Sequence, residues 1–174
     1  AVGKTVTDKG FKKAAILAPN YPAGKDALAG FKRYFKGEVV METYTPLSQL
    51  DYGAELSKMR ASGADAVYIF LPGGLGINFI KQFVGAGLSK DITLFGPGFS
   101  GDEDVIKAVG DPMLGMFNTS QWGHDMDNAA NKKFVADFQK EFGRLPTLYA
   151  AQAYDAAMLM DAAVRDVKGN LDNK

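Results

Sequence analysis

The 174-residue sequence contains no cysteine, and this absence excludes disulfide bonds, thiolate nucleophiles and cysteine-ligated metal sites. It also lacks an excess of either charge, because 20 lysines and arginines balance 20 aspartates and glutamates. That balance would not attract nucleic acid, so we expect no nucleic-acid partner. No apolar run approaches the roughly 20 residues that a membrane-spanning helix needs, and residues 1–5 do not resemble a signal peptide. Hydrophobic residues make up 47% of the chain, enough for one substantial domain with part of another.

Three short apolar runs each lead into a turn rich in glycine and proline and then into a helical pattern. The runs are 14–18, 66–71 and 92–95, and the turns are 19–24, 72–74 and 96–101. Uniformly apolar strands alternating with helices predict an α/β fold, a doubly wound parallel sheet with flanking helices. Small ligands bind at the carboxyl ends of such strands, where these turns gather. The turns carry few side chains capable of catalysis, so the sequence predicts a binding protein and not an enzyme.

The alternation of strands and helices stops before the end of the chain. We expect strands at 13–18, 39–44, 65–71, 92–95 and 115–122, and helices at 4–13, 24–36, 51–63, 75–85 and from 102. After a polar loop at 123–128, only helices follow, at 129–142 and 147–167. The last helix is apolar over much of its circumference and therefore requires burial on more than one side. We place a domain boundary near 122–128, which separates residues 1–122 from 123–174.

Gly73, Gly74 and Gly76 lie between a strand and a helix, as glycines do in a dinucleotide-binding loop. The fingerprint that starts at Gly74 requires a small residue at position 79, where Phe79 would prevent close packing of helix and strand. A nucleotide-dependent enzyme is therefore only an alternative, and we expect no cofactor. The amides at the start of such a helix would still suit a carboxylate.

Ser100 and His124 are the other candidates for chemistry. The segment 98–102 approaches the nucleophile elbow G-x-S-x-G but lacks its final glycine, so we interpret Ser100 as a turn or capping serine. His124 lies near Asp125 and Asp127, but no further ligand is spaced to complete a metal site. We expect neither a catalytic triad nor a metal.

Three aromatic residues fall in turns or at the ends of elements, where a role in the core is less natural. They are Tyr21, Phe99 and Tyr149. Two interpretations stay open: the rings pack the loops, or they form an apolar, partly aromatic clamp for a small organic ligand.

Five segments follow one another along the chain: Lys13–Leu17, Tyr21–Asp26, Gly63–Tyr68, Phe95–Pro97 and Tyr154–Ala157. Together they resemble the type I periplasmic binding proteins, most closely the branched-chain amino-acid (leucine/isoleucine/valine) binding family of ABC importers. The resemblance implies two lobes of flavodoxin- or Rossmann-like fold that close on a solute without a catalytic step. Residues 1–122 would be the ligand-binding second lobe, and 123–174 a crossover with helices of a truncated first lobe.

The same resemblance implies a periplasmic location, the permease of an importer as a partner, and a set of ligand contacts. These contacts are Tyr21, Ala23, Pro72, Gly73, Gly74, Gly98, Phe99 and Tyr149. Amino-acid binders usually carry an acid where this chain has Gly98, and a buried ammonium without such a partner is strongly disfavoured. The expected solute is therefore a small aromatic or aliphatic carboxylate, and a branched-chain or other amino acid is the alternative. Because the resemblance implies that most of the first lobe is missing, we expect this segment alone to bind its solute weakly and to self-associate through its last helices.

Overall fold

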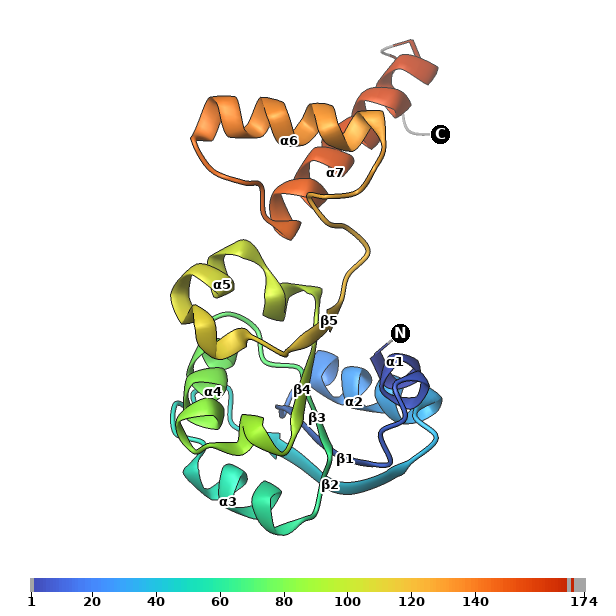
Figure 1. The fold of residues 1–174 in the computed structure, drawn as a ribbon. Helices are drawn as coiled ribbons and strands as arrows, with labels where there is room; N and C mark the ends of the chain where they lie inside the picture. The colour runs from blue at the N-terminus through green and yellow to red at the C-terminus, as the bar shows by residue number, and fades with distance from the viewer. Residues whose placement is uncertain (1, 169, 171–174) are drawn as a thin grey trace. The chain divides into compact units, whose positions relative to one another are not determined.

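The computed structural model describes residues 2–168 and 170 and divides the chain after Gln121 into two compact units (Figure 1). The first unit contains α1 (Val2–Asp8), β1 (Lys13–Pro19), α2 (Pro22–Tyr34), β2 (Glu38–Thr45), α3 (Gly53–Ala61), β3 (Ala66–Ile69), α4 (Gly74–Gly85), β4 (Thr93–Pro97), α5 (Glu103–Val109) and β5 (Phe117–Thr119). The second unit contains α6 (Ala129–Phe142) and α7 (Leu148–Asp166).

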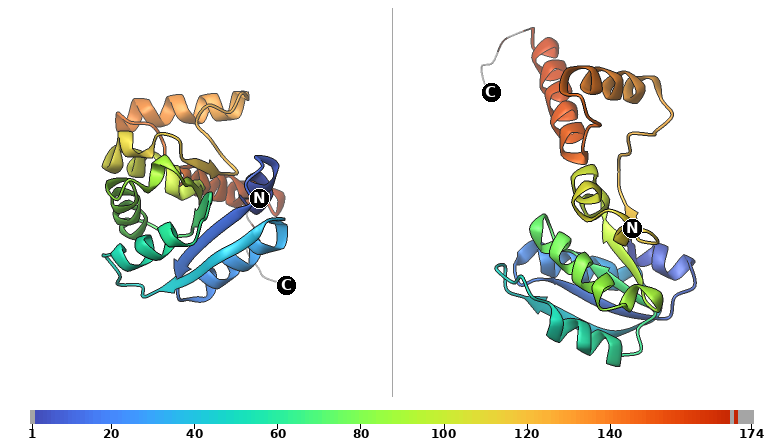
Figure 2. Two further views of the ribbon diagram at one scale, coloured as in Figure 1. Left: turned by 60° about the horizontal axis from the view of Figure 1, so that its bottom comes forward. Right: turned by 60° about the vertical axis from the view of Figure 1, so that its left-hand side comes forward.

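The five strands of the first unit form one sheet in the order β2-β1-β3-β4-β5, and every neighbouring pair is parallel. This confirms the predicted parallel α/β sheet. Helices α1 and α2 cover one face, and α3, α4 and α5 cover the other, as Figures 1 and 2 show. Because β1, β3 and β4 are adjacent and parallel, the three turns that follow them lie side by side at the carboxyl ends of the strands.

The central strands are apolar throughout because their successive side chains face two separate cores. In β1, Ala15 and Leu17 pack with α3 and α4, whereas Ala14 and Ile16 pack with α1 and α2. All four side chains are fully buried. The edge strand β2 is only partly buried along most of its length, which agrees with its mixed polar and apolar sequence.

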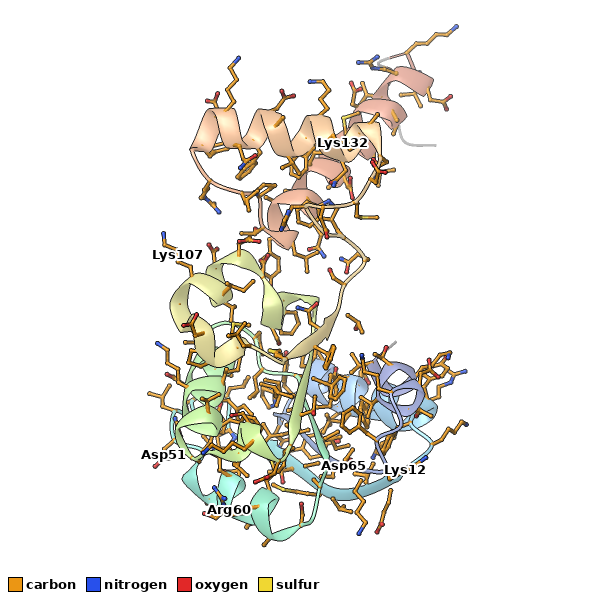
Figure 3. The ribbon with its side chains drawn as sticks, viewed as in Figure 1. Lys12, Asp51, Arg60, Asp65, Lys107 and Lys132 are labelled. Atoms are coloured by element: carbon orange, nitrogen blue, oxygen red, sulfur yellow. The ribbon has the colours of Figure 1, made fainter. Side chains whose placement is uncertain are left out.

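At the amino-terminal edge of the sheet, the carboxylate of Asp65 links two strands (Figure 3). It accepts hydrogen bonds from the backbone amides of Lys12 and Lys13, at 2.9 and 3.0 Å. These charge-assisted bonds hold the start of β1 beside the start of β3. Asp65 therefore has a structural role at the edge opposite the predicted ligand turns.

Two helices begin at other residues than the sequence predicts. Helix α2 begins at Pro22, inside the predicted turn, because proline has a φ suited to the first helical position and lacks an amide that would need a partner there. Helix α3 begins at Gly53 with Tyr52 as its N-cap. Asp51, where the predicted helix starts, lies before the helix, and its side chain accepts a hydrogen bond from the amide of Gly53 at 2.9 Å.

Several other predicted boundaries are also wrong. Helix α1 ends at Asp8 and not near 13, because the chain turns at Gly10, whose φ of 89° is left-handed. β4 extends through Pro97, into the predicted turn. β5 comprises three residues and not 115–122. Its one neighbour in the described sheet is β4, and the two strands are paired only from Phe117 to Thr119.

The second unit confirms the two predicted helices. α6 is capped by Asn128 and α7 by Thr147, whose side-chain oxygens accept amide hydrogen bonds. Phe134 of α6 packs on Tyr154 of α7, with ring centroids 4.6 Å apart. Much of the apolar surface of α7 is exposed, namely Tyr149, Tyr154, Met158, Leu159, Met160 and Val164. Among residues 2–168 and 170, no helix combines the length and apolar character needed to cross a membrane.

The close packing of α4 on the segment that follows β3 predicts a stability effect at Gly76. A Cβ at this position would collide with the carbonyl oxygen of Leu71, so we expect Gly76→Ala to lower the free energy of unfolding by about 1–3 kcal/mol. Gly85 lies in the same helix with open space around it, so Gly85→Ala should raise stability by about 0.4–1 kcal/mol. Urea denaturation measures both, and equal effects of the two variants would contradict this packing.

Burial of Tyr68 predicts a loss of stability at alkaline pH. Its side chain is 5% exposed, and desolvation raises its pKa to about 12 from the ordinary 10.0. The folded state therefore holds the phenolic proton more tightly than the unfolded state, and stability falls as pH rises from 10 toward 12, by up to about 3 kcal/mol. We expect Tyr68→Phe to remove this part of the slope, as measured by urea denaturation at pH 8 and pH 11. Tyr52, whose pKa is also raised to about 12 by burial, stays in both proteins.

Candidate functional site

The turn after β1 presents Tyr21 at the start of a helix. The amide of Asn20 donates to the carbonyl of Thr45 at 2.8 Å, which holds the turn against the end of β2. Tyr21 is the N-cap of α2 with an extended backbone, and its side chain is partly buried. Ala23, in the first turn of the helix, is exposed. The sequence-predicted contacts Tyr21 and Ala23 thus face the edge where the strands end.

The turn after β3 exposes the amino terminus of α4. Gly73 has a φ of 57°, a conformation that favours glycine, and it turns the chain into the helix that begins at Gly74. Pro72 is partly buried, and Gly73 and Gly74 are exposed. The first helical hydrogen bond runs from the amide of Ile77 to the carbonyl of Gly73, at 3.2 Å. The amides between them point out of the helix start, where a carboxylate is favoured.

A row of three aromatic rings crosses the ends of β1, β3 and β4. The ring centroids of Tyr21 and Phe70 lie 6.5 Å apart, and those of Phe70 and Phe99 lie 5.2 Å apart at 79°, in a T-shaped contact. All three side chains are partly buried. The structure therefore brings together two of the predicted aromatic contacts.

Phe70, the ring between them, is absent from the predicted contacts. The sequence predicts a strand that runs to residue 71 and includes Phe70, but β3 ends at Ile69. The backbone amide of Phe70 still donates to the carbonyl of Leu17 at 2.9 Å, which fixes the residue beside β1. Its position as the last aromatic residue before the Pro72 turn is the feature of the sequence that could have identified it as a candidate contact.

Gly98 packs against Ser120, the residue that follows β5. A Cβ at position 98 would lie 2.7 Å from Oγ and 2.9 Å from Cβ of Ser120. Ser120 thus fills the space that a side chain at position 98 would first occupy. An acid at this position would have to displace Ser120.

The alternative chemistries find little support in the geometry. Ser100 is 2% exposed, and its hydroxyl has no hydrogen-bond partner among the described residues, so it lacks both access and a general base. The described part of the chain contains no group of three or more histidines and carboxylates arranged to hold a metal ion. Phe79 is fully buried and stacks on Phe83, with centroids 5.9 Å apart, where a dinucleotide-binding loop would need a small residue.

The remaining predicted contact, Tyr149, belongs to the second unit. It is the second residue of α7, and its side chain is 57% exposed. Its contribution to a ligand site stays a prediction.

The candidate contacts of the first unit, which are aromatic rings and main-chain amides, make up a candidate half-site. A hollow of about 340 Å³ lies elsewhere, beside α5, where it is lined by Ile106, Met113 and Met116. None of the candidate contacts lines it.

The aromatic row predicts that Phe70 holds Phe99 in place. We expect Phe70→Leu to shift the ring-proton resonances of Phe99, because the edge of one ring no longer faces the other. The ring of Phe142, which packs on Phe138 in the second unit, should keep its resonances and serves as the internal control. NMR of phenylalanine-labelled protein measures both, and unchanged Phe99 signals would show that the row does not persist in solution.

Comparison with known proteins places this chain in a family. The sequence profile described as Periplasmic binding protein matches residues 1–174. A protein of Brucella melitensis named Leu/Ile/Val-binding protein homolog 6 is 32% identical over 178 residues, which cover 98% of this chain and 46% of the relative.

Two solved structures are similar throughout this chain. The first is a solute binding protein of an ABC transporter from Rhodopseudomonas palustris BisB5 in complex with 3,4-dihydroxybenzoic acid, with a TM-score of 0.89 and 38% identity over 98% of this chain and 48% of that one. The second, an R. palustris solute binding protein in complex with benzoate, has a TM-score of 0.91 and 34% identity over 97% and 47%. The chain thus spans about half the length of these relatives. It belongs to the periplasmic binding protein family, as its resemblance to the type I proteins predicted.

Proposed function

We propose that this chain supplies one lobe, and part of the other, of a solute receptor for an ABC importer. Its solute is a small aromatic carboxylate, captured between the lobes. The observation that carries the proposal is the row of Tyr21, Phe70 and Phe99 beside the exposed amino terminus of α4. The relatives solved with benzoate and with 3,4-dihydroxybenzoic acid support the class of solute.

The chemistry of the half-site matches the two parts of such a ligand. The aromatic faces offer apolar contact and edge-to-face packing to a benzene ring, worth about 0.5–1.5 kcal/mol per pair beyond area burial. The outward amides and the positive end of the α4 dipole favour the carboxylate. No carboxylate side chain occurs among the predicted contacts, so an α-ammonium group would be buried here without a charge partner.

A receptor of this kind works by closure and needs no catalytic step. Each lobe supplies part of the contacts, so the ligand stabilises the closed state by binding it more tightly than the open one. Residues 1–122 would form the lobe that carries the aromatic row, and residues 123–174 would belong to the other lobe, with Tyr149 near the cleft. The receptor would act in the periplasm and deliver its solute to the membrane permease.

A branched-chain amino acid is the second candidate solute, because the Brucella relative is named for leucine, isoleucine and valine. In that case another residue of the intact receptor would have to pair with the ammonium in place of an acid at position 98.

The test is isothermal titration calorimetry of the intact receptor, the polypeptide that contains both lobes, with benzoate, 3,4-dihydroxybenzoate, leucine and glutamate. We expect saturable binding of the aromatic acids and none of the amino acids. Phe99→Ala should weaken benzoate binding about 3- to 10-fold, since it removes one ring contact. Phe142→Ala, which changes an exposed ring of α6, should not change it. Binding of leucine without benzoate would support the second candidate, and turnover of a nucleotide would contradict both.

A further inference from the structure

The two compact units of the chain are joined through Gln121. This residue is exposed, the backbone bends there, and it directly follows Ser120 and precedes Trp122. Its two neighbours are both held, each by contacts within its own unit.

On the side of the first unit, the chain is held up to Ser120. β5 is paired with β4 to its last residue, where Thr119 lies opposite Pro97. Ser120 then packs against the backbone of Gly98, so close that a Cβ there would lie 2.9 Å from the Cβ of Ser120. Glycine at position 98 is therefore required by this contact.

On the side of the second unit, one buried carboxamide holds the chain from Trp122 onward. The Oδ1 atom of Asn131 accepts the indole N–H of Trp122 at 2.7 Å. Its Nδ2 atom donates to the carbonyls of Gly123, His124 and Met126, at 3.1–3.2 Å. Asn131 is 7% exposed, so these bonds are shielded from water. The segment from Trp122 to Met126 is thereby tied to the first turn of α6.

We propose that bending between the two lobes is confined, in this connection, to Gln121, and that Gly98–Ser120 and Trp122–Asn131 are the anchors on its two sides. The inference rests on the proposed function, since closure is the motion that the hinge serves. It also links the hinge to the ligand: Gly98 precedes Phe99 in the chain, so a solute that fixes Phe99 acts next to the first anchor. Gly98 and Asn131 are thus positioning residues for closure.

The second anchor is tested without any ligand, by hydrogen exchange of the intact receptor. We expect Asn131→Ala, and Asn131→Asp, which keeps the acceptor for Trp122 but loses the donors, to accelerate exchange of the amides of Met126 and Asn128 at least tenfold. Lys140→Ala, on an exposed position of the same helix, should leave them unchanged. Unchanged exchange in both Asn131 variants would overturn the proposal, whatever the receptor binds.

The first anchor is tested by a compensating pair. Gly98→Ala should weaken benzoate binding tenfold or more and abolish the decrease in radius of gyration on benzoate addition, measured by calorimetry and small-angle X-ray scattering. Adding Ser120→Gly removes the colliding side chain and should restore both to within threefold of the wild type. If the double variant stays as weak as Gly98→Ala, Gly98 acts on the ligand and not on the hinge. If the wild type binds none of the aromatic acids or amino acids, the proposed function fails, while the exchange result still decides whether the second anchor exists.

Discussion

The whole arrangement depends on a parallel sheet that is buried on both faces. Burial on both faces demands apolar strands, and the crossovers between parallel strands demand helices on each side. Once β1, β3 and β4 are neighbours, the chain must leave the sheet at the same edge three times. A set of residues far apart in sequence is thus brought together by a constraint that concerns only the core.

The turns after β1 and β3 share one structural feature, a glycine in the first turn of the helix that follows. Gly24 is the third residue of α2, and its Cα lies against the carbonyl of Pro19; Gly76 is the third residue of α4, and its Cα lies against the carbonyl of Leu71. In both helices, the glycine allows the first turn to lie close to the backbone carbonyl of the residue five positions earlier. The dinucleotide fingerprint requires a small residue at position 79 for close packing of the helix. In this protein the small residue that allows close packing is Gly76. A packing requirement of the fold therefore explains both Gly24 and Gly76.

The sequence alone predicts the sheet, the order of its elements and both helices of the second unit, because these depend on periodicities that extend over many residues. It fails where a single contact decides the outcome. Pro22 starts a helix inside an expected turn, and Phe70 leaves an expected strand to stand between Tyr21 and Phe99. Ser120 is a further example, because no pattern in the sequence relates it to Gly98, 22 residues earlier. The boundaries of the elements and the contacts between distant residues depend on tertiary packing, and they determine the details of the candidate half-site.

In the proposed receptor, Gly98 takes part in both the selection of the solute and the motion of the lobes. Since Ser120 occupies the place of its side chain, an acid there would have to displace the residue that follows β5. The absence of an acid at position 98 is then explained by how the end of β5 is packed. The proposed preference for an aromatic acid and the proposed hinge thus share one physical basis, the close approach of the turn after β4 to the end of β5. An acid at position 98 would need a differently packed end of β5 as well as a different residue.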